Sequence, residues 1–174
     1  MKIHKSVKIA WNAQVEGKLK IGKKSSIWYS ASVRADYDKI TIAKGVNIQD
    51  AAVIHVDKGS PCKIGAFTTI GHGAIIHGCD IGKNCIIGMG AIILNGAKIG
   101  DNSIVAAGAV VTQNKVFASG SLIMGSPASI KRELSVDEIK ENMLNAKHYI
   151  KISKNNRHKP YKAKPWTNAP KCNY

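Results

Sequence analysis

Three of the chain's six histidines, His55, His72 and His77, lie within a stretch of 23 residues. Neutral imidazole nitrogen is a preferred ligand of zinc, and iron and cobalt also accept it. Three such ligands would leave the fourth position of a tetrahedral ion open to water, which is typical of catalytic zinc. A single histidine more often has a structural role, so a metal site requires a fold that brings these side chains together.

An internal repeat of six residues determines where these histidines can lie. Ile or Val occupies every sixth position from 9 to 33, from 42 to 54, from 64 to 76 and from 81 to 111. The following residue is often Gly or Ala, which suits a tight turn where a larger side chain would be crowded. A period of six fits neither the 3.6-residue helix nor a long alternating strand. It predicts an all-β fold, a parallel β-helix in which each hexapeptide supplies one short strand and one turn.

The repeat resembles that of left-handed β-helix proteins, whose coils place three hexapeptides on the three flat faces of a prism. With about eighteen residues per coil, His55 and His77 occupy the same position on consecutive coils, because the 22-residue step between them is one coil plus a four-residue insertion. Their backbones would be about 4.8 Å apart, close enough to share a metal ion. Arg34 lies in the same column, one coil earlier. His72 lies on another face, near Gln49, and could complete the site only from a neighbouring subunit, which suggests a closed trimer.

The repeat ends after residue 126. Residues 1–126 are therefore predicted to form the β-helix, and residues 127–174 a C-terminal helix and basic tail packed on the same domain. The helix is expected over residues 135–154, where Ser135 and Glu138 have the spacing of a capping box. An apolar stripe at helical spacing would face the prism. The stripe comprises Ile139, Met143, Ala146 and Ile150.

The composition indicates one soluble domain. A hydrophobic content of 44% in 174 residues supports a packed core, and no run of 18 apolar residues could span a membrane. The N-terminus lacks the apolar core of a signal peptide, so we expect a cytoplasmic location. In that compartment the four cysteines, which form no CxxC pair, are expected to be reduced structural thiols, with a disulfide or a thiolate metal ligand as the alternative. They are Cys62, Cys79, Cys85 and Cys172.

The chain is strongly basic, with a formal net charge of +15. Such a charge can accompany nucleic-acid binding, but the lysines are scattered along turns and the C-terminal tail, and no nucleic-acid-binding motif accompanies them. We therefore expect a solvated basic surface, with no nucleic-acid partner, that attracts small anions such as bicarbonate.

Several segments together resemble the γ-class carbonic anhydrases and their short bacterial relatives. They are the R-A-D segment at 34–36, the N-I-Q-D segment at 47–50, TIGHGAIIHGCDIG, IIGMGAIILNGAKIGDN and VAAGAVVTQNKVFASGSLIMGSPA. The similarity runs in order from about residue 3 to about residue 152. It implies a homotrimer with a zinc or iron ion held by His55 and His77 of one subunit and His72 of the next. It also implies that a hydroxide on this metal converts CO2 to bicarbonate.

The same resemblance implies roles for five further residues. Arg34 and Asp36 match the pair that ties subunits together near the site. Gln49 matches the residue that hydrogen-bonds the metal hydroxide, and Asp50 its charged neighbour. Tyr149 matches a position whose hydroxyl comes near the metal cleft. The plainer interpretation is solvated surface charge for the ionic residues, an exposed amide for the glutamine and simple packing for the tyrosine.

The sequence departs from the family pattern at two places. Ala35 replaces the glycine of the R-G-D form. The short loop VDKGSPCK at 56–63 contains no glutamate, whereas the founding members of the family carry glutamates in an acidic loop that helps to move protons. Proton export would then depend on Tyr37 or Tyr149.

The leading prediction is thus a zinc-dependent lyase that hydrates CO2 reversibly. Two other functions stay open, because a fold does not determine a function. One is a hexapeptide-repeat acyltransferase using acyl-CoA, which would need one histidine as a base and a CoA groove rather than three ligand-spaced histidines. The other is a metal-binding trimer with little turnover, which the missing acidic loop supports.

Overall fold

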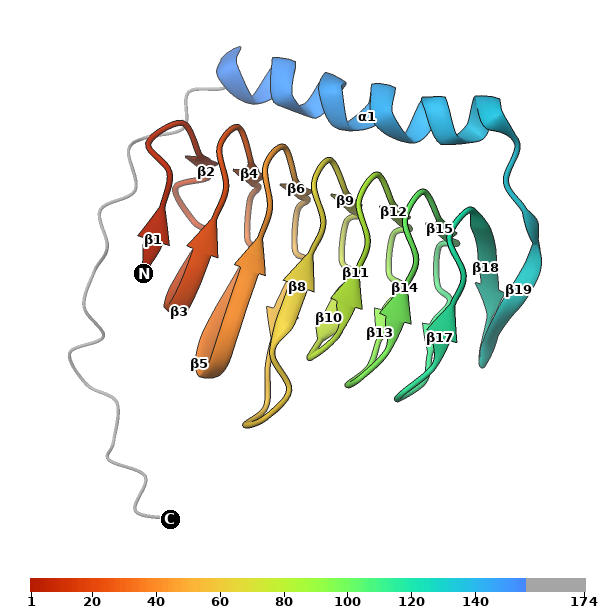
Figure 1. Cartoon of the computed structure of the whole chain (residues 1–174). Helices are drawn as coiled ribbons and strands as arrows, with labels where there is room; N and C mark the ends of the chain where they lie inside the picture. The colour runs from red at the N-terminus through yellow and green to blue at the C-terminus, as the bar shows by residue number, and fades with distance from the viewer. Residues whose placement is uncertain (156–174) are drawn as a thin grey trace.

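The computed structural model describes residues 1–155, which form a prism of short strands with one helix running along it (Figure 1). Most strands are two or three residues long, and each turn of the repeat ends one of them. The strands are β1 Lys2–Ile3, β2 Lys8–Ile9, β3 Gln14–Ile21, β4 Ser26–Ile27, β5 Ser32–Ile42, β6 Asn47–Ile48, β7 Val53–His55, β8 Cys62–Ile64, β9 Thr69–Ile70, β10 Ile75–His77, β11 Asp80–Ile81, β12 Ile86–Ile87, β13 Ile92–Ile93, β14 Lys98–Ile99, β15 Ile104–Val105, β16 Val110–Val111, β17 Val116–Phe117, β18 Ser121–Gly125 and β19 Ala128–Glu133.

The strands form three flat faces, which we call A, B and C. Face A contains the first parts of β3 and β5 with β7, β10, β13 and β16. Face B contains β1 and the last parts of β3 and β5 with β8, β11, β14 and β17. Face C contains β2, β4, β6, β9, β12, β15 and β18. Because β5 pairs with β7 near its start and with β8 near its end, it bends around the corner between faces A and B.

The core consists of stacked aliphatic columns, one on each face. On face A the members of the column are Cα partners on successive coils and are buried. Burial of each such side chain contributes about 1.5–3 kcal/mol, so each coil stabilises the next. The column consists of Val15, Val33, Ile54, Ile76, Ile93 and Val111. The predicted fold class, a left-handed parallel β-helix followed by an α-helix, is confirmed.

The last strand is one that the six-residue repeat does not predict. β19 pairs antiparallel with β18, and the turn between them contains the predicted boundary at residue 126. Most residues of β19 are exposed, so the strand does not carry the buried Ile or Val that recurs every six residues in most other strands. It covers an edge at the end of face C that would otherwise be open to another chain. The division into units 1–126 and 127–174 stays a prediction.

Helix α1, expected over residues 135–154, spans Val136–Asn155. Its capping box is present. The N–H of Glu138 donates to Ser135 Oγ at 3.2 Å, and the N–H of Ser135 donates to Glu138 Oε2 at 2.8 Å. The helix runs back along the prism and packs against β4, β6 and β9 of face C (Figure 1).

The helix interface is more polar than the predicted stripe suggests. Ala146 is fully buried, but so is Asn142, which donates to the backbone carbonyl of Asn84 at 3.1 Å. Asn84 in turn donates to the carbonyl of Ile139 at 3.0 Å. These side chain–backbone bonds attach the helix to the turns of the prism in addition to the apolar contacts.

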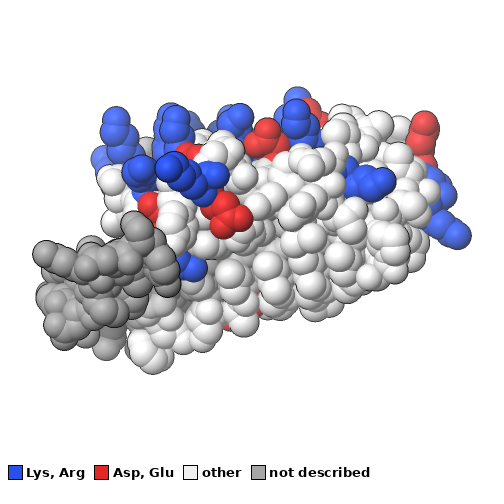
Figure 2. Space-filling view, turned by 90° about the horizontal axis from the view of Figure 1, so that it is seen from below, with Lys and Arg blue, Asp and Glu red and all other residues white. Residues whose placement is uncertain are grey.

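The surface of residues 1–155 carries its positive charge unevenly. On the side opposite the helix, Lys and Arg side chains gather along one edge, next to a broad area without charges (Figure 2). The lysines are therefore less evenly scattered than the sequence indicates. No helix in this range combines the length and the apolarity needed to cross a bilayer. Cys172 and the rest of the predicted basic tail lie outside the described residues.

Candidate metal centre

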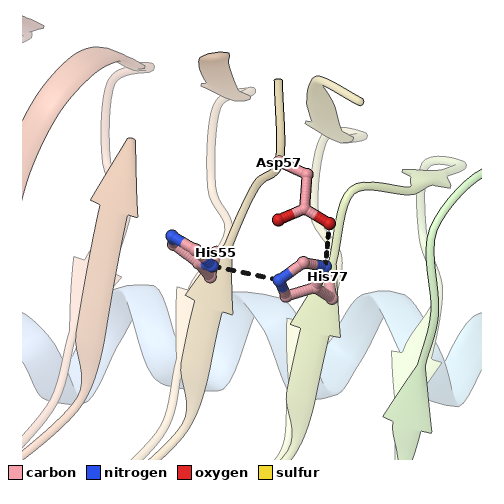
Figure 3. Close-up of side chains that lie close together, drawn as sticks. All are labelled: His55, Asp57 and His77. Atoms are coloured by element: carbon pink, nitrogen blue, oxygen red, sulfur yellow. Dashed lines mark hydrogen bonds and ion pairs between the residues drawn. The ribbon is translucent and has the colours of Figure 1, made fainter. Parts of the chain in front are cut away.

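His55 and His77 are stacked at the corner between faces A and B. His55 ends β7, His77 ends β10, and the two are Cα partners in the parallel ladder. Nδ1 of His55 lies 3.0 Å from Nε2 of His77 (Figure 3). Each histidine directly follows the inward isoleucine of its coil, so strand register places the two rings side by side. The stacking that the repeat predicts is observed.

Each of these histidines also has a hydrogen-bond acceptor at its other ring nitrogen. His55 Nε2 lies 2.9 Å from Asp36 Oδ1, and His77 Nδ1 lies 2.6 Å from Asn95 Oδ1. An acceptor holds the proton on the nitrogen that faces it, so the remaining nitrogens direct their lone pairs toward one another. Two nitrogens on one tetrahedral zinc ion are about 3.3 Å apart, given bonds of about 2.0–2.1 Å. The pair therefore fits a shared metal ion.

Asp36 connects His55 to the cationic side chain of Arg34. Arg34 is the ladder partner of His55 one coil earlier, and it forms an ion pair with Asp36. Partial burial acts to raise the pKa of Asp36, but the hydrogen bonds from His55 and the backbone, together with the charge of Arg34, outweigh it and lower the pKa. Asp36 is therefore ionised at neutral pH and acts as an acceptor. The role of Arg34 and Asp36 in tying subunits together stays a prediction.

A second polar cluster lies at the corner between faces C and A. Here turns on consecutive coils carry Asp50 and His72, and Nδ1 of His72 lies 3.0 Å from Oδ2 of Asp50. The carboxylate holds the proton on Nδ1, which leaves the lone pair on Nε2 of His72 available for a ligand. The His72 side chain is 47% exposed, against 14% for His55. His72 thus has the same kind of support as the stacked pair but faces solvent.

Gln49 lies in the same turn as Asp50 and is buried rather than exposed. It is 5% exposed, and its Nε2 donates to Asn47 Oδ1 at 3.1 Å. Asn47 Nδ2 donates to Thr69 Oγ1 at 2.8 Å, and Asn145 of α1 donates to the same oxygen at 2.9 Å. A chain of hydrogen bonds from the helix therefore holds the Gln49 amide in place.

Tyr149 reaches this corner from α1. Its ring packs edge-on against Trp28, with the ring centroids 5.5 Å apart. Burial raises the pKa of Tyr149, and the negative charge of Asp50 adds to the rise. The charge of Asp50 therefore acts on Tyr149, which also packs on the prism through Trp28.

The two clusters lie at opposite ends of the face A strands. The turns at 49–52 and 71–74 lead into face A, whereas His55 and His77 end its strands. Within residues 1–155, the side chains that converge as a metal-ligand group are His55, Asp57 and His77, whose ligand atoms lie within 4.8 Å of one another. His72 is not part of this group. One chain thus brings two of the three predicted ligands together and separates the third, with Gln49 and its neighbours, from them.

Two further residues of this corner, Asp57 and Asn95, were not predicted from the sequence. Oδ2 of Asp57, in the loop after β7, lies 3.9 Å from His77 Nδ1, and Asn95 Nδ2 donates to this oxygen at 2.8 Å. Asn95 is 18 residues after His77, one coil along, so coil spacing could have found it. Tyr37, predicted as a proton relay, lies with its ring 6.2 Å from that of His55 and is 60% exposed.

The three described cysteines are free and buried. Burial raises the pKa of Cys85 to about 11. The pKa of Cys79 is well above its ordinary value, because its thiol is hydrogen-bonded to Cys62 and because it is buried. Since the thiolate rather than the thiol binds metals, these side chains fit the structural interpretation better than the ligand alternative.

Comparison with known proteins shows the family. Residues 78–113 match the family model described as "Bacterial transferase hexapeptide (six repeats)". The "Probable carbonic anhydrase" of Methanocaldococcus jannaschii is 51% identical over 151 residues, which cover 87% of this chain and 95% of that protein. "Gamma carbonic anhydrase 2, mitochondrial" of Arabidopsis thaliana is 39% identical over 157 residues, which cover 87% of this chain and 56% of that protein. This chain belongs to the γ-carbonic anhydrase-like family of hexapeptide-repeat proteins. The family predicted from the motifs is confirmed.

A solved structure with the same fold is named as a transferase. The crystal structure of a hexapeptide transferase family protein from Anaplasma phagocytophilum is 39% identical and superposes with a TM-score of 0.85, covering 88% of this chain and 91% of that one. The names of the relatives support a carbonic anhydrase-like enzyme, and with it a metal cofactor. The name of the solved structure supports a transferase as the second candidate.

Proposed function

We propose that this protein is a metal-dependent carbonic anhydrase-like enzyme that interconverts CO2 and bicarbonate at a site built between two subunits. The observation that carries the proposal is the His55–His77 pair, whose inner nitrogens face each other at 3.0 Å while each outer nitrogen has an acceptor. Metal-binding histidines in proteins are generally held in this way. The carbonic anhydrase names of the relatives support the same function.

The ion would be held by His55 and His77 of one subunit and His72 of a neighbouring subunit. Three imidazole ligands suit zinc, and iron or cobalt also accept them. Each histidine has an oxygen acceptor for its outer ring nitrogen. The acceptor is Asp36 for His55, Asn95 for His77 and Asp50 for His72. When bound, the ion would lower the pKa of a coordinated water to about 7, which CO2 hydration requires at neutral pH.

Assembly of subunits would bring the two corners together. The outer side of face A carries an apolar row of Cα partners on successive coils, in which Val53 and Ile75 are 37% and 38% exposed. The row consists of Val53, Ile75, Ile92 and Val110. Exposed apolar rows favour burial against another subunit. Contact between the C/A corner of one subunit and the A/B corner of the next is head-to-tail, and closure around a three-fold axis gives a homotrimer with three equal sites.

The residues beside His72 at the C/A corner would orient the water and transfer its proton. Asn47 holds the Gln49 amide through Nε2, so Oε1 of Gln49 can accept a hydrogen bond from water and turn a water lone pair toward CO2. Tyr149 is protonated at neutral pH, as a tyrosine ordinarily is, and its raised pKa keeps it so. Its hydroxyl can therefore donate to Asp50 and relay a proton rather than act as a base. Positive charge on the surface would attract bicarbonate.

The metal content per subunit, measured together with the molecular mass in solution on anaerobically purified protein, tests the proposal. We expect a wild-type trimer with about one ion per chain, and loss of most of it in His72→Ala and in His77→Ala. His4→Ala removes an exposed histidine outside both clusters and should retain the metal. CO2 hydration should follow the metal content. A wild-type protein that takes up no stoichiometric zinc, iron or cobalt would overturn the proposal.

Acyl transfer from acyl-CoA is the second candidate, favoured by the transferase names of the family model and the solved structure. A surface cavity of about 370 Å³ lies beside the A/B corner, with Lys63 and Lys98 among its lining residues, and lysines can bind phosphate groups. Binding of CoA by the wild type, with no CO2 hydration by the metal-loaded protein, would favour this function. A metal-loaded trimer with neither activity would support the third candidate, metal binding with little turnover.

A further inference from the structure

His77 ends a chain of three polar groups, of which the proposed function uses only the contact between His77 and Asn95. His77 Nδ1 lies 2.6 Å from Asn95 Oδ1, and Asn95 Nδ2 donates to Asp57 Oδ2 at 2.8 Å. The three residues come from separate segments, namely the end of β10, the turn after β13 and the loop after β7. Carboxylate, amide and imidazole thus lie in series.

The Asp57 carboxylate determines which way the Asn95 amide points. An ionised carboxylate can only accept hydrogen bonds, so the NH2 group of Asn95 must face Asp57 and its Oδ1 must face His77. A carbonyl oxygen also can only accept, so the His77 nitrogen facing it must carry the ring proton. In the neutral ring Nε2 of His77 is then unprotonated, and it is the nitrogen directed at His55 (Figure 3).

The backbone leaves room for this amide. Gly78, directly after His77, has a φ of +51°, and a Cβ there would lie 2.4 Å from Asn95 Oδ1. The equivalent turn one coil further contains Gly96 and Asn114, and a Cβ on Gly96 would lie 2.1 Å from Asn114 Oδ1. Asn114 therefore lies against Gly96 as Asn95 lies against Gly78, but the residue before Gly96 is an asparagine and not a histidine. Asn114 serves as a control for loss of the amide, although its φ of +59° adds backbone strain on substitution that Asn95 does not have.

We infer that Asp57 and Asn95 are positioning residues that select the Nδ1–H tautomer of His77 and thereby raise its affinity for the metal. This inference rests on the proposed function. Asp57 acts through Asn95 and is not the third ligand, although it belongs to the converging group. Its carboxylate faces Nδ1 of His77 whereas His55 faces Nε2, so one ion cannot use both contacts as the side chains lie.

The zinc affinity of the full-length protein, measured by competition with a chelator, is the first test. We expect Asn95→Leu to bind zinc about 10–100-fold more weakly than the wild type, and Asn114→Leu to match the wild type within about two-fold. Asp57→Asn should weaken binding by about 10-fold, because the Asn95 amide can then flip. The double variant Asn95→Asp with Asp57→Asn restores the order of acceptor and donor and should recover most of the affinity.

The ring ¹⁵N chemical shifts of His77 in the metal-free protein give a second readout that does not depend on metal. We expect a protonated Nδ1 in the wild type and the double variant, and a mixture of tautomers in Asn95→Leu. If Asn95→Leu does not fold, Asn95→Ser provides the same comparison. A wild type protonated on Nε2 of His77, or an Asn95 variant with wild-type zinc affinity, would overturn the inference. A wild type that binds none of zinc, iron and cobalt would instead overturn the proposed function, and the chemical shifts would still decide whether Asp57 and Asn95 select the tautomer.

Discussion

The two ends of face A support histidines of the same kind in different ways. At the A/B corner, His55 and His77 lie on strand ends, where parallel register stacks them and holds their inner nitrogens 3.0 Å apart. At the C/A corner, His72 lies in an exposed turn beside Asp50, and helix α1 brings Tyr149 to the same place. The strands produce a prearranged pair, whereas the turns present one histidine together with polar side chains.

Under the proposed function, each chain would carry two half-sites rather than one complete site. A pair held by backbone register is preorganised and loses little conformational freedom when it binds an ion. A histidine in an exposed turn has its outer nitrogen satisfied and its inner nitrogen unused within its own chain. Because the halves lie at opposite ends of face A, three-histidine binding would require assembly. Metal content would then report on oligomerisation.

Mixing two inactive variants should have the largest effect. His77→Ala removes the A/B half-site and His72→Ala removes the C/A half-site, so either homotrimer should lose nearly all CO2 hydration. Co-expression in equal amounts should restore about a quarter of the sites, namely those in which an intact half of each kind meets. Metal content and hydration rate measure the recovery. His77→Ala mixed with His55→Ala is the control, because both changes affect the same half and no site should recover. Recovery in that control would contradict the division into halves.

A change at Gln49 should separate catalysis from metal binding. Gln49→Leu keeps the buried volume but removes the amide that would orient water, so we expect kcat/KM for CO2 hydration to fall about 100-fold. Metal content should stay at the wild-type level, since the side-chain hydrogen bond that holds Gln49 is to Asn47 and not to a histidine. Gln14→Leu, at an exposed glutamine of β3, is the matched control. Loss of metal in Gln49→Leu would mean that the C/A corner also determines binding.

Two glycines, one beside a histidine at each corner, allow crowding to be distinguished from backbone strain. Gly73 follows His72 with a φ of +65°, and Gly78 follows His77 with a φ of +51°. A Cβ on Gly73 meets nothing within 4 Å, whereas one on Gly78 would lie 2.4 Å from Asn95 Oδ1. We expect Gly73→Ala to lower the free energy of unfolding by about 1–2 kcal/mol. Gly78→Ala should lower it further and also weaken zinc binding. Denaturant unfolding and chelator competition measure the two effects, and equal behaviour of both variants would contradict the crowding argument.

The helix cap should have the smallest effect, and it concerns the C/A corner because α1 carries Tyr149. Ser135→Ala removes the cap hydroxyl and should cost about 1 kcal/mol of stability. The hydrogen bond from Arg132, followed by the backbone bond from Ser135, lowers the pKa of Glu138 to about 2. A lowered folded-state pKa stabilises the fold above the unfolded value near 4.5, and this contribution is lost as the pH falls from there toward 2.

Unfolding measured across that pH range checks the prediction. Glu138→Gln should lose the acid-dependent part of the stability, whereas Glu141→Gln, at an exposed glutamate of the same helix, should keep it. If Glu138→Gln kept the wild-type pH dependence, the pair with Arg132 would contribute nothing to the cap.

The residues whose place in the fold is most predictable are those whose position is set by the six-residue repeat. The column of Arg34, His55 and His77 was predicted, since parallel register converts spacing into place. α1 was predicted to within one residue at each end, because the capping box is a local motif. β19 was missed, since it pairs antiparallel and is exposed on most of its length.

The coiled fold, the family and the stacking of two histidines follow from the amino-acid sequence, because a six-residue repeat leaves few ways to arrange the chain. Which oxygens accept from the ring N–H groups follows from the three-dimensional arrangement alone. Asn95 lies one coil beyond His77, Asp57 lies in an irregular loop, and their side chains meet through hydrogen bonds. The direction of a hydrogen bond depends on side-chain orientation between separate segments, and no spacing along the chain carries that information.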